Sequence, residues 1–350
     1  MRFNRNGSLL VAIGLLAMAA VTACGGETTG TSGAGGETGS GGGPGSGGAG
    51  GESPGNVYQV ASSLDDYSSL VAAVDKAGLA DALQDETAML TVFAPDNDAF
   101  AALLAAVGAA SLDDVTAEQL RPILLYHVLG EEVDSTGATA AAESGAKVTG
   151  LGGAIQLGFE GADIELDDSA IIEVADVPAS NGIIHGISGV LLPSIVDMAS
   201  TTPELSSLLA AVLAADGADG TTPKVSVALD APAAVGAYTL FAPSNDAFAA
   251  LGGGAPAGQA LTNVLLYHVV NGAAPIYAGD ALGLAAPTAF DTLRGATAPF
   301  QIVVSASGSP PDTVNIDDAG SDANTTVIGA NYFTSNGVLH IIDKVLLPGE

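Results

Sequence analysis

Phe93–Leu103 reads FAPDNDAFAAL and Phe241–Leu251 reads FAPSNDAFAAL, so ten of the eleven positions are identical. In both copies a β-prone run ends at the proline of this block, because proline cannot continue a central strand. The polar residues after the proline can cap a helix, and the aspartate that follows suits the first turn of one. The sequence therefore predicts, twice, a buried strand that is followed directly by a helix.

Two further blocks repeat in the same order along the chain. Leu124–Val128 and Leu265–Val269 both read LLYHV. Asn181–Pro193 reads NGIIHGISGVLLP, and Asn336–Pro348 reads NGVLHIIDKVLLP. Three blocks repeated in one order indicate two copies of one structural unit. Each copy has about 150 residues, which is enough to bury a core of its own.

The segments between these blocks predict an α+β fold. Thr116-x-x-Gln119 is a capping box that opens a helix, and Thr202-Pro203-Glu204 starts another. Residues 155–159 alternate apolar and polar, which is typical of a half-buried strand. Long apolar helices together with many short strands indicate two tandem α+β domains and not a relay of βαβ units.

The first residues predict export and attachment to a lipid. A short basic start and an apolar run of about a dozen residues are typical of a secretory signal peptide, which we place at residues 1–23. The run ends in Val21-Thr22-Ala23-Cys24, which resembles the lipobox of bacterial lipoproteins. The resemblance implies cleavage before Cys24 and acylation of its thiol. Gly25, and not Asp, follows this cysteine, which favours the outer membrane or the cell surface.

A tether separates the lipid from the folded part. Residues 24–55 hold the cysteine and a run rich in Gly, Ser and Thr, which cannot bury a core. Such a segment behaves as a flexible coil with a reach of roughly 30 Å. We place the first domain at residues 56–197 and the second at 198–350.

The charge balance excludes one large class of partner. The chain has 39 acidic residues against 8 Lys and Arg, for a formal net charge of −31. A nucleic-acid binder needs a basic surface, so we expect no nucleic acid as partner. A hydrophobic content of 48% excludes a wholly disordered acidic chain. Since Cys24 is the only cysteine, no intrachain disulfide can form.

The three repeated blocks together resemble the fasciclin domain family. The resemblance extends from about residue 56 to the C-terminus and implies two tandem domains, each a wedge or sandwich of β-strands with packed helices. It also implies a place outside the cell or on a membrane, with roles in adhesion and matrix association. The first copy departs from the family pattern at Ser188, where the second has Asp343, so the contact of that carboxylate is open in the first domain.

The repeated polar residues are the candidate interaction or structural motif: Tyr126, His127, Asn181, His185, Tyr267, His268, Asn336 and His340. All four histidines lie in repeated blocks, which fits a metal site, a catalytic base or a structural role. Their apolar neighbours favour the structural role. The resemblance implies that the stretch around the Tyr-His pair binds receptors in some animal members. The Asn-Gly pairs are typical of a turn entering a strand, with a ligand-contacting loop as the alternative.

The sequence predicts no metal site and no cofactor. Asp167-Asp168 and the stretch from Asp317 to Asp322 raise the question of calcium, but the latter lacks the spacing and the closing Glu of a calcium loop. A solvated acidic loop is the favoured interpretation there. The chain also lacks the G-x-S-x-G, H-E-x-x-H and P-loop motifs, and no G-x-G-x-x-G follows a strand. We therefore expect no catalytic residue and no enzyme activity.

Together these observations predict an envelope-anchored, surface-displayed adhesion or interaction module of two fasciclin-like domains. The alternative is a lipoprotein that binds a polysaccharide or a small ligand. The expected partners are the membrane, through the lipid anchor, and another protein or an extracellular polysaccharide. Because fold alone does not fix function, the adhesive role depends on the family resemblance.

Overall fold

A computed structural model describes the two repeated units. The described residues are 54–217, 224–230, 237–252, 256–272, 274–294, 301–308, 311–317 and 325–348. The expected signal peptide, Cys24 and nearly all of the tether lie outside these ranges, as do Asp318 to Asp322 of the acidic stretch. No helix among the described residues is long and apolar enough to cross a membrane.

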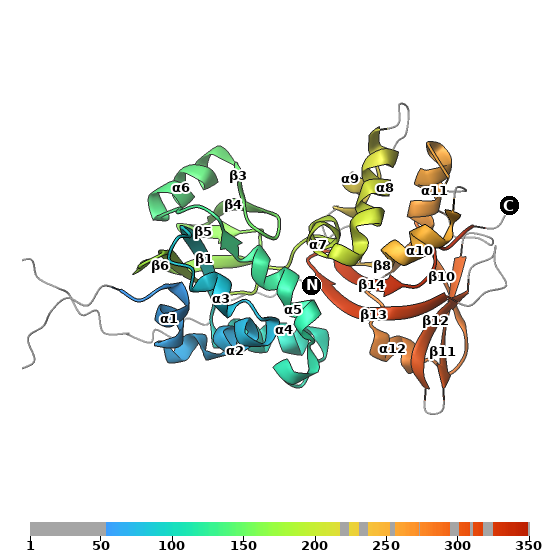
Figure 1. Ribbon diagram of the computed structural model, residues 1–350, viewed down its shortest axis with the longest axis horizontal. Helices are drawn as coiled ribbons and strands as arrows, with labels where there is room; N and C mark the ends of the chain where they lie inside the picture. Colours follow the sequence, from blue (N-terminus) through green and yellow to red (C-terminus); the bar gives the residue numbers. More distant parts are fainter. Residues whose placement is uncertain are drawn as a thin grey trace, which may run out of the picture. The chain divides into compact units, whose positions relative to one another are not determined.

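The first copy begins with helices and ends with a strand (Figure 1). Its elements are α1 (Val57–Ser62), η1 (Asp65–Tyr67), α2 (Ser68–Ala77), α3 (Ala80–Leu83), β1 (Leu90–Pro95), α4 (Asn97–Val107), η2 (Leu112–Asp114), α5 (Ala117–Tyr126), β2 (Val128–Leu129), α6 (Ser135–Ser144), β3 (Lys147–Thr149), β4 (Ala154–Glu160), β5 (Asp163–Leu166), β6 (Ala170–Ala179) and β7 (Gly182–Ile187).

The second copy repeats this order of elements, except that no counterpart of η2 is described between α10 and α11; it begins with α7, three residues before the boundary that the sequence placed at residue 198. Its elements are α7 (Ile195–Thr201), η3 (Pro203–Leu205), α8 (Ser206–Gly217), α9 (Val225–Leu229), β8 (Ala237–Pro243), α10 (Asn245–Ala250), α11 (Gln259–Tyr267), β9 (Val269–Gly272), α12 (Ala278–Leu282), β10 (Thr288–Asp291), β11 (Gln301–Gly308), β12 (Pro311–Asp317), β13 (Thr325–Thr334) and β14 (Gly337–Ile342).

Each copy contains one seven-stranded sheet, which confirms the α+β class. The strand orders are β2-β1-β7-β6-β5-β4-β3 and β10-β11-β12-β13-β14-β8-β9. Antiparallel pairs dominate, but β1 pairs with β7 in parallel, and β8 pairs with β14 in the same way. The strand of the first repeated block and the strand of the last one are therefore neighbours in each domain.

Both faces of the β1 strand are covered. Val92 and Ala94 belong to a buried cluster that includes residues of α2, α4 and α5, whereas Phe93 belongs to a second cluster with residues of α6, β4 and β5. Figure 1 shows α2, α4 and α5 grouped beside the first sheet and α6 near β4. In the second domain Leu240 and Phe241 divide in the same way between two clusters. A strand buried on both faces reads as a continuous apolar run, as this block does.

The predicted caps are present. Asp96 caps α4 through the amide of Ala99, and Ser244 caps α10 through the amide of Ala247. Thr116 and Gln119 form the predicted capping box of α5. The alternation over residues 155–159 buries Ile155 and Leu157 but leaves Phe159 44% exposed at the end of β4, so the half-buried pattern stops before this residue.

Candidate functional site

His127 and His268 occupy equivalent positions at the ends of α5 and α11. Each imidazole Nδ1 faces a carbonyl oxygen of its own helix, Ile123 at 2.8 Å or Val264 at 2.7 Å. Each Nε2 accepts from a backbone amide of the closing Val-Leu-Leu-Pro run, at 2.9 Å in both domains. Because a carbonyl can only accept and an amide can only donate, both rings are neutral with the proton on Nδ1. These rings bind the helix end to the last segment of each domain.

His185 and His340, in β7 and β14, also join backbone segments of their domains. Nε2 of His185 donates to the carbonyl of Val133 at 2.8 Å, and Nδ1 accepts from the amide of Asp176 at 3.3 Å. His340 repeats this with Ile276 and Asn331 at 2.7 and 3.3 Å. In the first domain the ring also stacks on Phe93, with 5.7 Å between centroids. These imidazoles are neutral too, with the proton on Nε2.

The histidines are placed to stabilise the fold and not to bind a metal. All four are buried, and both nitrogens of each ring are in use. A metal ion would have to displace one of these backbone partners. Among the described residues no group of three or more His, Cys, Asp or Glu could hold a metal ion. Burial lowers the pKa of His127 and of His340 to about 4, which keeps both rings uncharged at neutral pH.

Ser135, Asp176 and His185 lie together but in the wrong order for a catalytic triad. The hydroxyl of Ser135 donates to Asp176 Oδ2, and Asp176 Oδ1 is 4.0 Å from His185 Nδ1. In a nucleophilic triad the histidine lies between the serine and the carboxylate and accepts the hydroxyl proton. Here His185 is buried and its Nε2 is occupied by the carbonyl of Val133. This arrangement cannot activate the serine.

Asn181 and Asn336 hold the start of each domain onto its sheet. The Oδ1 of Asn181 accepts from the amide of Val57 at 2.8 Å, while Nδ2 donates to the carbonyls of Leu83 and Asp85 at 3.0 Å each. Asn336 accepts from the amide of Ile195 and donates to the carbonyl of Leu229. One buried amide thus joins three backbone segments. The alternative of a ligand-contacting loop does not fit Asn181, which is fully buried.

The tyrosines of the Tyr-His pairs lie in the interior. Tyr126 and Tyr267 belong to the two clusters on the far side of the sheets from the large helices. The hydroxyl of Tyr126 donates to Asp167 Oδ2 at 2.9 Å and lies 3.2 Å from the carbonyl of Ala154. A receptor that binds near the Tyr-His pairs would therefore contact residues other than Tyr126 and Tyr267.

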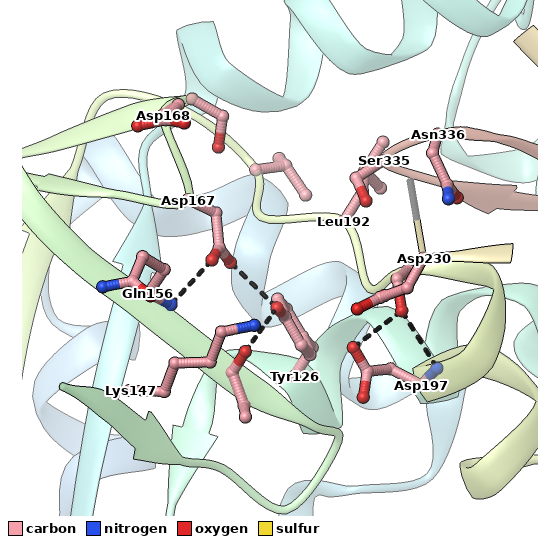
Figure 2. A pocket seen from close by; sticks show the side chains of 14 residues that line it. Tyr126, Lys147, Gln156, Asp167, Asp168, Leu192, Asp197, Asp230, Ser335 and Asn336 are labelled. Carbon is pink, nitrogen blue, oxygen red and sulfur yellow. Dashed lines mark hydrogen bonds between the residues drawn. The ribbon is translucent and has the colours of Figure 1, made fainter. Parts of the chain in front are cut away.

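Tyr126 reaches the floor of a polar cavity of about 570 Å³, shown in Figure 2. The lining comes from both copies: from residues between 126 and 194 on one side, and from Asp197, Asp230, Ser335 and Asn336 on the other. The lining residues with carboxylate, amide or amine groups are Lys147, Gln156, Asp167, Asp168, Asp197, Asp230 and Asn336. Asp167 also accepts from the amide of Gln156 at 2.7 Å, so this carboxylate is fixed in place. We call this cavity the junction pocket.

The junction pocket is acidic and partly shielded from solvent. Burial raises the pKa of Asp167 and of Asp197. The neighbouring charge of Asp230 adds to the rise at Asp197, whereas Lys147 opposes it at both carboxylates. Burial and the charge of Asp167 also raise the pKa of the Tyr126 hydroxyl, so this group stays protonated as a donor. The pocket can thus offer oxygen acceptors together with one ammonium group.

Ser188 keeps the contact that the sequence left open. Its Oγ accepts from the amide of Ile171 at 3.0 Å, as Asp343 Oδ1 accepts from the amide of Thr326 at 2.8 Å. A hydroxyl and a carboxylate can both accept this bond. The departure from the family pattern therefore costs the first domain no hydrogen bond.

Most of the junction pocket was not predicted from the sequence. Asp167 and Asp168 were singled out only as an acidic pair, and Asp197, Asp230 and Lys147 were not. Tyr126 and Asn336, which belong to the predicted motif, do line the pocket, and a further local signal is Gly152-Gly153. A Cβ on Gly153 would lie 2.7 Å from Cγ of Asp197, so only glycine allows this approach.

Fold and site together define a tandem pair of α+β modules whose repeated polar residues hold backbone segments together. The chain belongs to the fasciclin domain family: the sequence model of the Fasciclin domain matches residues 65–193 and 207–348. The family resemblance inferred from the repeated blocks is therefore confirmed.

Relatives with this domain occur in bacteria and in animals. Protein sll1483 of Synechocystis sp. is 38% identical over 143 residues, which cover 41% of this chain and 76% of the relative. Transforming growth factor-beta-induced protein ig-h3 of Sus scrofa is 34% identical over 140 residues, 40% of this chain but only 19% of the relative. The structure of a FAS1 domain pair from the insect cell adhesion molecule Fasciclin I aligns with 79% of this chain and 95% of its own, at 17% identity and a TM-score of 0.37.

Proposed function

We propose that this protein is a lipid-anchored adhesion or interaction module, displayed on the cell envelope and without enzyme activity. The main support is the use of its repeated polar residues: every histidine bonds backbone on both ring nitrogens, and none is available for chemistry. The family adds to this, because its resemblance implies roles in adhesion and matrix association. The strong negative charge favours partners other than anionic polymers, unless cations bridge the two surfaces.

The anchor is tested by Cys24→Ala in the full-length protein. We expect the wild-type protein to incorporate a labelled fatty acid and to sediment with membranes. The variant should lose the label and appear in the soluble fraction, because a cleaved lipoprotein is held only by its acyl chains. A labelled, membrane-bound Cys24→Ala protein would contradict the anchor.

The adhesive role is tested in the cells that make the protein. Deletion of the gene should lower aggregation and attachment to surfaces, wild-type protein should restore both, and the unanchored Cys24→Ala protein should not. Unchanged attachment in the deletion strain would contradict adhesion. In parallel, wild-type protein in detergent is incubated with envelope extracts and matrix polysaccharides, and captured macromolecules are identified.

The second candidate function is binding of a polysaccharide or a small ligand, and the junction pocket favours it. A cavity of about 570 Å³ with fixed oxygen acceptors has the size and polarity that suit a hydroxyl-rich ligand such as a sugar unit. Capture of one small molecule and no macromolecule in the incubation above would favour this function over adhesion.

A further inference from the structure

Gln119 joins the first copy to the second. Its Oε1 accepts from the amide of Thr116 at 2.6 Å and so completes the capping box of α5. Its Nε2 donates to the carbonyls of Ala330 and Asn331 in β13, at 2.7 and 3.0 Å. The side chain is only 7% exposed. One amide therefore caps a helix of the first domain and binds a strand of the second.

The repeat shows that the helix does not require this glutamine. By the offset of the LLYHV block, Gln119 and Thr116 correspond to Ala260 and Ala257 in the second copy. There α11 starts at Gln259 after Gly258, without a side-chain cap. Two equivalent helices thus form with and without the capping box. Of these two helices, α5 lies at the contact between the domains, and it differs from α11 in carrying the donor group of Gln119.

The two acceptor carbonyls lie at a β-bulge of the second sheet. The register between β13 and β14 shifts between Gly329 and Tyr332, and Asn331 has a φ of 59°. A bulge of this kind takes residues out of the regular ladder, so their carbonyls need other donors. The equivalent bulge of the first copy is at Ala175 and Asp176 in β6, and there these residues are exposed. The β13 bulge is the one that receives a side chain from the other domain.

The rest of the contact is largely apolar. One buried cluster contains residues of α5 in the first domain and of α7, α8 and β13 in the second, and Asp197 approaches Gly153 closely. On either side the contact opens into hollows: the junction pocket, and a second one of about 450 Å³ lined in part by Gln119, Tyr277 and Asn331. Apolar packing is non-directional, so the two hydrogen bonds from the buried amide of Gln119 supply the directional part of this contact.

We propose that Gln119 couples the two domains into one rigid body, so that a partner meets a composite surface containing the junction pocket. This deepens the proposed function, since it states what the displayed module presents. It does not depend on adhesion, because the same coupling would hold a ligand pocket in shape.

The test separates the two roles of the side chain. Gln119→Glu keeps an oxygen for the amide of Thr116 but loses both donors and places a carboxylate against two carbonyls. Thr116→Ala removes the cap on the amide of Gln119 but leaves the donors of Gln119 in place. Gln259→Ala is the matched control in the second domain, where this exposed side chain donates to Oδ1 of Asn263 within its own helix.

The readout is the distance between fluorophores at Ser62→Cys and Val227→Cys, in full-length protein that carries Cys24→Ala. Both sites are exposed, and they lie in different domains. We expect Gln119→Glu to widen the distance distribution at least twofold, with unchanged far-UV circular dichroism, and Thr116→Ala and Gln259→Ala to leave it narrow. Equal widening by Gln119→Glu and Thr116→Ala would assign the effect to helix capping. No widening in Gln119→Glu, or a wild-type distribution as wide as that of the variant, would also overturn the proposal.

Discussion

Gly182→Ala is expected to lower the free energy of unfolding by about 4 kcal/mol, and Gly337→Ala by a similar amount. Such a loss is a large part of the stability of an ordinary domain. The cause lies in the parallel pairing of β1 with β7 and of β8 with β14, where the Asn-Gly pair enters the second strand of each pair.

The geometry at these glycines leaves no room for a side chain. A Cβ on Gly182 would lie 1.9 Å from the carbonyl oxygen of Leu90, and on Gly337 it would lie 2.1 Å from that of Tyr238. The φ angles are 150° and 159°, which L-residues rarely adopt. An alanine here must therefore push the two strands apart, and it also disturbs the amide of Asn181 or Asn336 beside it.

Gly78→Ala is the matched control. Gly78 ends α2 with a φ of 67°, but a Cβ there would have no atom within 4 Å. Its replacement should cost only about 1 kcal/mol, because the backbone strain remains and the clash is absent. Urea unfolding followed by circular dichroism measures all three variants. Similar losses in Gly78→Ala and Gly182→Ala would show that the approach of the two strands is not what requires glycine.

The Asn-Gly pairs also show how far the sequence could be interpreted. The dipeptide correctly predicted an entry into a strand, because the local pattern of a turn residue before apolar residues carries that information. It could not show that Asn181 would receive the amide of Val57, which lies 124 residues earlier in the chain. A hydrogen bond over such a separation depends on the packing of the whole domain.

The same limit explains why the fold was more predictable than the candidate site. The repeated blocks carry periodicity, caps and strand ends, all of which are local, and they correctly predicted two α+β domains. The junction pocket instead combines residues as far apart as Lys147 and Asp230, which no local pattern joins. Gln119 was identified as a cap from its spacing to Thr116, but its second role depends on β13, more than 200 residues later.

Acidification is expected to destabilise the protein through its buried histidines. The pKa of His127 and of His340 is about 4 in the folded protein, against 6.5 for an ordinary histidine. Burial is the main cause, because a charged imidazole would lose its hydration, and the carbonyl that each ring binds opposes the shift. Protonation would also remove the acceptor of a backbone amide in each domain.

The sign follows from proton counting. Between pH 6.5 and 4 the unfolded chain binds a proton at each of these positions and the folded chain does not, so stability falls as the pH falls. The contribution is fully present above pH 6.5 and is lost by about pH 4. The difference between a pKa of about 4 and one of 6.5 corresponds to about 3 kcal/mol for each histidine. When both histidines act on one unfolding transition, their joint contribution is comparable to the whole free energy of unfolding of a typical domain.

Two buried carboxylates act in the opposite direction. Burial raises the pKa of Asp167 and of Asp197, so the folded chain binds protons at these carboxylates at a higher pH than the unfolded chain does. Through these two groups, acidification therefore increases the stability of the folded protein. The decrease in net negative charge also relieves repulsion. The total stability of the wild-type protein is therefore a poor measure of the histidines alone, and a difference between variants is needed.

The double variant His127→Gln, His340→Gln supplies that difference. Glutamine can donate and accept but does not titrate, so the variant should be less stable than wild type at pH 7 because its bonds are less well placed. As the pH falls to 4, the wild type loses the histidine contribution and the variant does not, while the carboxylates act equally in both. The gap in unfolding free energy should therefore shrink by about 6 kcal/mol between pH 7 and pH 4, measured by urea unfolding at each pH. A gap that stays constant would contradict the prediction, because it would mean that the buried imidazoles keep ordinary pKa values in the folded protein.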